Sequence, residues 1–112
     1  MEQAGTPGIE ISHEEQGSSG AFFVQTEAGR LAELTYTRPS PQIAVIEHTE
    51  VSAALRGGGV GRLLVEAVVE WARKTNTKLL PICAYAKSVF ERHPELRDVL
   101  QQSARRRITA EL

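Results

Sequence analysis

Apolar and polar residues alternate through much of the N-terminal half of the chain, the pattern of strands with one buried face. The clearest case is the segment 31–37, where Ala32, Leu34 and Tyr36 share one face. Arg38-Pro39-Ser40-Pro41 is predicted to end this strand, because proline removes a backbone donor. Further strands are predicted at residues 9–12, 21–24 and 43–51, with loops at residues 16–20 and 27–30. Short loops between successive strands predict an antiparallel meander.

A helical pattern follows from Val60 to Lys74. Apolar residues recur there at i, i+3, i+4 and i+7, and they form a stripe wide enough to cover one face of a sheet. Trp71 lies within the stripe, so we predict that it packs in the core and does not hold a cofactor. The segment 75–77 is expected to end the helix.

The compact apolar run from Lys78 to Cys83 predicts a buried fifth strand. A strand, a crossover helix and a strand form a parallel pair, so this strand should lie beside the segment 43–51. Pro81 cannot donate to a ladder and would be tolerated where the two strands part, which would leave a cleft. A helix over 84–92 and a last helix opened by Pro94 should follow. The predicted fold class is α+β, an α/β sandwich with an antiparallel meander, a β-α-β unit with a splayed parallel pair, and C-terminal helices.

Composition places the chain among ordinary globular proteins. Its 112 residues are enough for one domain and one core, with 41% hydrophobic and 24% charged residues. The net charge of -1 gives no reason to expect nucleic acid or an anionic membrane as partner. The single cysteine excludes an internal disulfide, and neither a secretory signal nor a membrane span is expected. We expect a cytoplasmic monomer or homodimer with one domain at 9–102, a disordered tail at 1–8, and a polar tail at 103–112 that contains Arg105-Arg106-Arg107.

The segment Leu55–Arg62 is rich in glycine and lies between the strand predicted at 43–51 and the first predicted helix. Glycines allow close backbone approach, and a helix N-terminus adds N–H groups and partial positive charge. Such a turn can bind a diphosphate, or it can be a connection that simply requires glycine. A Walker loop is excluded, because Arg62-Leu63 stand where Lys and Ser or Thr are needed. The dinucleotide fingerprint fails because Arg62 occupies its third glycine position.

Two places near the predicted cleft carry groups suited to chemistry. On the strand at 43–51, Glu47, His48 and Glu50 are candidate bases. Simple alternation puts His48 and Glu50 on one face and Glu47 on the other, unless a bulge intervenes. His48 is preferred because histidine titrates near neutrality, although a hydrogen-bonded structural histidine fits the position as well. Cys83 ends a strand before a helix N-terminus, where it could relay an acyl group or pack as a small apolar residue.

The spacing Arg56-x-x-Gly59-x-Gly61 resembles the Arg/Gln-x-x-Gly-x-Gly/Ala loop of the GNAT acetyltransferase superfamily. Over roughly residues 9–100 the chain looks like the short, single-domain N-acetyltransferase proteins of that superfamily. The residues that carry this likeness are His48-Thr49-Glu50-Val51, the glycine loop, and Pro81-x-Cys83-x-Tyr85 followed by Phe90-Glu91-Arg92-His93-Pro94. Longer GNAT enzymes cover the acceptor site with a pair of helices, which form a roof over it. In this chain only residues 14–20 are available at that position, too few for such a pair.

This resemblance implies an N-acetyltransferase that takes acetyl-coenzyme A as cosubstrate and an amine of a small molecule, peptide or protein as acceptor. It implies that backbone groups of Val51 and Ser52 pair with the pantetheine arm. Tyr85 would be the acid for the leaving thiolate, with His48 as candidate base, Cys83 as candidate relay, and no metal. The diphosphate would lie against backbone groups of Arg56, Gly57, Gly58, Gly59, Val60 and Gly61, helped by the side chain of Arg56 or Arg62.

Two other functions stay open at this point. The protein could bind coenzyme A as a sensor without turnover, or Cys83 and a histidine could hydrolyse the thioester. The missing roof favours a bulky acceptor that reaches an open cleft, or a second subunit that completes the site.

Overall fold

The computed structural model describes residues 9–110, with side-chain environments through residue 108. Five strands form one sheet in the order β1-β2-β3-β4-β5. Neighbouring strands are antiparallel from β1 to β4, whereas β4 and β5 are parallel. The bounds are Ser12–Gln16 for β1, Ser19–Thr26 for β2, Gly29–Ser40 for β3, Ile43–Val51 for β4 and Lys78–Pro81 for β5. The mixed sheet confirms the predicted α+β fold class.

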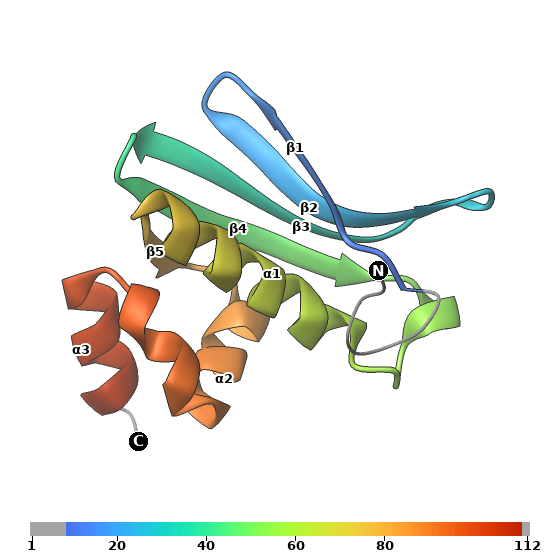
Figure 1. The fold of residues 1–112 in the computed structure, drawn as a ribbon. Coiled ribbons are helices and arrows are strands. Elements are labelled where there is room, and N and C mark those ends of the chain that lie inside the picture. Colours follow the sequence, from blue (N-terminus) through green and yellow to red (C-terminus); the bar gives the residue numbers. More distant parts are fainter. Residues whose placement is uncertain (1–8, 111–112) are drawn as a thin grey trace.

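The helices lie against one face of the sheet and leave the other face uncovered (Figure 1). Helix α1 (Val60–Thr75) is the crossover from β4 to β5, α2 (Ala84–Arg92) follows β5, and α3 (Gln102–Ala110) ends the described chain. The 3-10 helices η1 (Ala53–Leu55) and η2 (Pro94–Val99) precede α1 and follow α2. None of the described helices is long and apolar enough to cross a bilayer.

The core lies between the sheet and the helices, as the two periodicities predict. Ala32, Leu34 and Tyr36 of β3 are buried on the helix side, and α1 buries its apolar stripe against them. Each large apolar side chain removed from water contributes about 1.5–3 kcal/mol to stability. Trp71 is only partly buried, but it packs against the core, as expected.

The N-terminal hairpin is shifted from its predicted position. The sequence predicts a strand at 9–12 and a loop at 16–20, whereas β1 spans Ser12–Gln16 and pairs Gln16 with Ser19. The connection is a two-residue turn that needs only Gly17, at φ 61°, and Ser18. The turn-forming residues on either side therefore join the ladder.

β3 continues to Ser40, beyond the Arg38-Pro39 position where we predict its end. The pairing of β3 with β4 is irregular between Thr37 and Ser40, so Pro39 falls where a missing N–H breaks no regular ladder. The backbone N–H of Arg38 still donates to Ser18 at 2.7 Å, which holds this end of the strand in the sheet.

The C-terminal segment 103–112 is not a polar tail throughout, because residues 102–110 form α3. Ala104 and Ile108 are buried, and Ile108 belongs to the main hydrophobic core. This i, i+4 pair is separated by three arginines, which conceal the apolar pattern of the helix in the sequence. The disorder predicted for residues 1–8 lies outside the described residues.

A network centred on Tyr36 ties β1 to β3 and α1. The Tyr36 side chain is 1% exposed, its Oη lies 2.6 Å from Nε2 of His13, and it donates to Glu15 at 3.0 Å. The His13 ring stacks on Phe22 at 4.0 Å and meets Trp71 edge to face. Burial lowers the pKa of His13 from its ordinary value, an effect that the charge of Glu15 only partly offsets.

We expect the free energy of unfolding to decrease as the pH falls below about 6.5, the ordinary pKa of histidine. Because the folded-state pKa of His13 is lowered, the unfolded chain takes up the proton first, so protonation favours unfolding. This contribution is complete above the ordinary pKa and is lost as the pH falls toward the folded-state pKa. Urea unfolding of the wild type and His13→Gln across this range measures it. Identical pH dependence in the two proteins would contradict the assignment.

Candidate functional site

The parallel strands β4 and β5 separate after a short common stretch. Their register runs from the pair Ile43–Lys78 to the pair Ile46–Pro81. Beyond it the carbonyl oxygen of Ile46 accepts the N–H groups of Ile82 at 2.9 Å and Cys83 at 3.3 Å, and the chain turns into α2. β4 continues to Val51. The gap expected at Pro81 is therefore present.

A bulge at Glu47 changes which side chains of β4 face the helices. The register shifts between the pairs Thr35–His48 and Tyr36–Ile46, which leaves Glu47 as the extra residue. Ala44 and Ile46 face the helices before the bulge, and Thr49 and Val51 do so after it. Glu47, His48 and Glu50 therefore all lie on the uncovered face. This corrects the simple alternation, which places Glu47 on the opposite face.

At the end of β4, the backbone groups of Val51 and those of Ser52 point in opposite directions. The N–H of Ser52 donates to Leu31 at 2.7 Å and its carbonyl accepts from Leu55 at 2.9 Å. The fold therefore already uses both backbone groups of Ser52. Because successive residues of a strand point their peptide groups to opposite sides, those of Val51 face the gap. There the Val51 carbonyl accepts from Nε of Arg56 at 3.2 Å.

The glycine loop ends in a helix N-terminus with no side-chain cap. Gly59 is the N-cap residue of α1 in the left-handed region, at φ 76°, and the first turn of α1 contains no acidic residue. The first intrahelical bond runs from Leu63 to Gly59 at 3.1 Å, so the preceding N–H groups have no intrahelical acceptor. Those groups and the helix dipole form a site for an anion. The N–H groups of Arg56 and Gly58, in contrast, bond to carbonyls within the turn.

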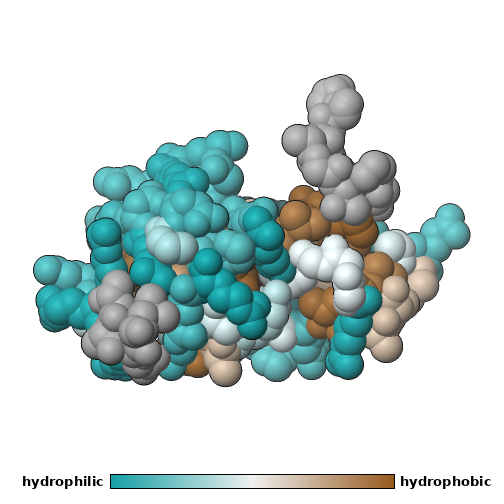
Figure 2. Space-filling view, turned by 90° about the horizontal axis from the view of Figure 1, so that it is seen from below, coloured by the Kyte–Doolittle hydropathy of each residue, from teal (hydrophilic) through white to brown (hydrophobic). Residues whose placement is uncertain are grey.

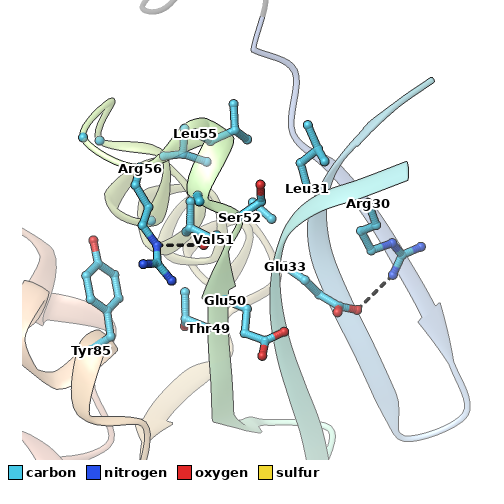
Figure 3. Close-up of a pocket in the computed structure, with 16 residues that line it drawn as sticks. Arg30, Leu31, Glu33, Thr49, Glu50, Val51, Ser52, Leu55, Arg56 and Tyr85 are labelled. Carbon is cyan, nitrogen blue, oxygen red and sulfur yellow. Dashed lines mark hydrogen bonds and ion pairs between the residues drawn. The ribbon is translucent and has the colours of Figure 1, made fainter. Parts of the chain in front are cut away.

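A cavity of about 650 Å³ joins the gap to this helix N-terminus. Figure 3 shows Arg56 and Tyr85 on one side of it, with Val51 and Thr49 between them and the residues of β3. Of the residues predicted to bind the coenzyme, those that line it are Val51, Ser52, Arg56, Gly57, Gly59, Val60 and Gly61. Gly58 and Arg62 are not among the lining residues, and the Arg62 side chain instead donates to Glu66 at 2.8 Å.

Hydrophobic residues gather at the same end of the molecule on the helix side, while most of the remaining surface in this view is hydrophilic (Figure 2). Ala53, Leu55 and Val60 are apolar residues of the cavity wall at this end. The wall therefore combines an apolar part with the polar backbone of the loop. This is the usual composition of a small-ligand site.

Tyr85 forms the part of the cavity wall beside the start of α1. It lies in the first turn of α2, and its ring covers Gly61, so a Cβ at Gly61 would come within 2.7 Å of Tyr85 Oη. A side chain at Gly61 would therefore displace the Tyr85 ring, which is 40% exposed, from its place over the start of α1.

The other two predicted catalytic residues do not line the cavity. His48 is on the uncovered face with Nε2 3.2 Å from Oε2 of Glu50, and its side chain is 62% exposed. Cys83 is at the closed end of the gap, where its Sγ lies 3.6 Å from Oγ1 of Thr49. Thr49, Glu50 and Tyr85 line the cavity, whereas His48 and Cys83 are not among its lining residues.

Sequence reasoning missed the contribution of β3 to the cavity. Arg30, Leu31 and Glu33 line it because the start of β3 pairs with the end of β4, with Glu33 opposite Glu50. An antiparallel register counted back from the β3–β4 turn could have placed them near the cavity. Among the residues that the structure describes, no group of His, Cys, Asp and Glu is arranged to hold a metal ion.

The family model described as GCN5-related N-acetyl-transferase matches residues 21–99. A GCN5-like protein of Staphylococcus aureus, assigned as an N-acetyltransferase, is 35% identical, with 86% of this chain and 91% of that chain covered and a TM-score of 0.65. No curated protein matches.

Two further structures share the fold at low identity. Ribosomal-protein-alanine N-acetyltransferase of Brucella melitensis is 15% identical with a TM-score of 0.56, covering 70% of this chain and 64% of that one. A GNAT family acetyltransferase of Elizabethkingia anophelis with acetyl-coenzyme A bound is 13% identical with a TM-score of 0.56, covering 68% and 65%. The family model and the Staphylococcus aureus protein together show that this chain belongs to the GCN5-related N-acetyltransferase family.

Proposed function

We propose that this protein transfers the acetyl group of acetyl-coenzyme A to an amine. The observation that carries the proposal is the cavity that joins the gap between β4 and β5 to the uncapped N-terminus of α1. An anion site and a slot for an extended chain are thereby adjacent, which matches a ligand made of a diphosphate and a pantetheine arm. The family match supports the same cosubstrate.

The diphosphate is placed against the N-terminus of α1. The N–H groups of Val60 and Gly61 have no intrahelical acceptor and lie beside the cavity. Arg56 lines the cavity and supplies a positive charge, whereas Arg62 is paired along the helix with Glu66. We therefore assign the charge contact to Arg56.

The pantetheine arm is placed along β4, in the gap that β5 leaves. The peptide groups of Val51 would pair with the amides of the arm as a neighbouring strand does. This requires the Arg56 side chain to leave the Val51 carbonyl, which accepts its Nε–H at 3.2 Å. The thioester would then lie between Thr49 and Tyr85.

The reaction is an acyl transfer with two proton movements. The amine nitrogen attacks the thioester carbonyl carbon, a C–N bond forms, and the C–S bond breaks. The coenzyme leaves as a thiolate, which the Tyr85 hydroxyl stabilises or protonates, and the amine gives up its proton to a base. We assign this base to the His48–Glu50 pair, of which the Glu50 carboxylate lines the cavity and lies 3.2 Å from Nε2 of His48.

Calorimetry with acetyl-coenzyme A, followed by an assay of thiol release with mixed amine acceptors, tests this function. We expect saturable binding, and release of coenzyme A that depends on the acceptor. Binding without release would make the protein a sensor, and release without acceptor would make it a hydrolase. Failure to bind at millimolar concentration would contradict the whole proposal.

Cys83→Ser separates direct transfer from a covalent relay. In a relay the thiolate attacks the thioester first, so the variant should lose turnover while it keeps its affinity for the coenzyme. In direct transfer both properties are kept, because serine preserves the size of the side chain and a polar contact with Thr49.

A further inference from the structure

The uncovered face of the sheet is strongly acidic over β1 to β4. The register places Glu14, Glu33 and Thr35 on this face, and the bulge adds Glu47 and Glu50. The Arg30 guanidinium bonds to Glu14 at 3.1 Å and to Glu33 at 2.9 Å, and it lies 3.7 Å above the ring of Phe23. Glu47 accepts from the Thr37 hydroxyl at 3.1 Å, and Glu50 lies beside His48. Four carboxylates thus share this face with the one guanidinium of Arg30.

Two of these carboxylates stand directly opposite each other at the mouth of the coenzyme cavity. Glu33 and Glu50 are cross-strand partners, and both line that cavity. Like charges at such positions destabilise a sheet. Arg30 offsets the charge of Glu33, and among the described residues Glu50 has only His48 as an ion-pair partner, so a cationic group above Glu50 would complete the neutralisation of the pair.

The acidic face continues as a second cavity. A hollow of about 470 Å³ extends from Glu33 across Thr35 to Glu47, between β1 and β4. Glu33 lines both cavities, so the hollow begins at the mouth of the coenzyme cavity. A chain that lies in the hollow could bring one amine to the thioester.

We infer that this face docks a lysine-rich, extended polypeptide segment as the acetyl acceptor, an inference that rests on the proposed function. The charge of the face selects a cationic occupant. The hollow has two acidic positions, one at Glu33 and one at Glu47, whose carboxylate is held by Thr37. Glu33 and Thr37 are four residues apart along β3, which corresponds to about 13 Å. Lysines four residues apart in an extended peptide repeat at the same distance and on the same side. A small polyamine fits less well, because small-ligand sites enclose most of the ligand, whereas none of the described helices covers this face.

The test measures fluorescence anisotropy with two short Gly/Ser peptides, one with several lysines and one with glutamates at the same positions. We expect the lysine peptide alone to bind, with an affinity that decreases as salt is added. Glu14→Gln/Glu47→Gln, which changes two carboxylates that line the hollow, should weaken its binding at least about tenfold, a difference of about 1.4 kcal/mol. The charge-matched control Glu91→Gln/Glu95→Gln changes carboxylates on the helix side and should bind within about threefold of the wild type.

Calorimetry with coenzyme A on the same preparations separates the two levels of the proposal. Glu14→Gln/Glu47→Gln should keep its affinity for coenzyme A within about threefold of the wild type, because neither residue lines the coenzyme cavity. If the wild type binds coenzyme A but not the lysine peptide, or if both double variants weaken the peptide equally, the docking inference is wrong while the proposed function stands. Competition by spermidine as effective as that of the peptide, per amine, would also overturn it in favour of a small polyamine. Absence of coenzyme binding would instead remove the proposed function.

Discussion

Gly59→Ala should weaken the binding of acetyl-coenzyme A at least about tenfold. Gly59 caps α1 at φ 76°, a conformation that costs other residues about 1–2 kcal/mol. The loop of the variant would relax from this conformation, and the N–H groups of Val60 and Gly61 would lose their common direction toward the ligand. Because 1.4 kcal/mol corresponds to a tenfold change in affinity, titration calorimetry resolves the effect.

Gly58→Ala is the matched control for this experiment. Gly58 is the neighbouring residue, but it does not have a positive φ and does not line the cavity. A Cβ there would meet only the carbonyl oxygen of Leu55, at an ordinary 3.4 Å. We expect its affinity to stay within about threefold of the wild type. Equal losses in the two variants would mean that the loop tolerates no side chain anywhere, and that the position of the diphosphate is not specified by Gly59.

Gly20→Ala should destabilise the fold by about 2–4 kcal/mol, the range of severe overpacking. A Cβ on Gly20 would lie 2.3 Å from Cζ and from Oη of Tyr36. The Tyr36 ring cannot easily move, because its Oη is bonded to Glu15 and contacts His13 while Trp71 packs against it. For a domain of this size the melting temperature should fall by roughly 10–25 °C.

Differential scanning calorimetry of Gly20→Ala beside Ser19→Ala checks this prediction. Ser19 precedes Gly20 in β2 but is exposed, so its variant should melt within a few degrees of the wild type. A Gly20→Ala protein as stable as Ser19→Ala would show that the tyrosine ring packs elsewhere.

Local patterns in the sequence predict the elements of this fold well where one residue type decides the outcome. β4 and α2 have the bounds expected from their apolar runs, and α1 extends one residue beyond its predicted end. The splayed strand pair could be anticipated because Pro81 cannot continue a ladder. In each case the deciding signal is local.

The errors arise where a distant partner decides. β3 continues past Pro39 because Ser18, in another turn, holds its end. α3 forms because Ile108 reaches the core, which its arginine-rich sequence conceals. The bulge at Glu47 cannot be found from β4 alone, since it is a property of the pairing with β3. Consequently the backbone part of the cavity was anticipated, whereas the side chains contributed by β3 were not.

The carbonyl oxygen of Ile46 accepts two backbone hydrogen bonds and so fixes the point where β4 and β5 diverge. Because both donors are main-chain N–H groups, the two strands are already separated in the empty protein, and no ligand is needed to separate them. Filling the slot should then leave the protection of these two amides against hydrogen exchange nearly unchanged, while protection rises around Val60 and Gly61. Most of the conformational entropy lost on binding would therefore be that of the ligand, because its flexible arm becomes extended along β4 while the strand itself changes little.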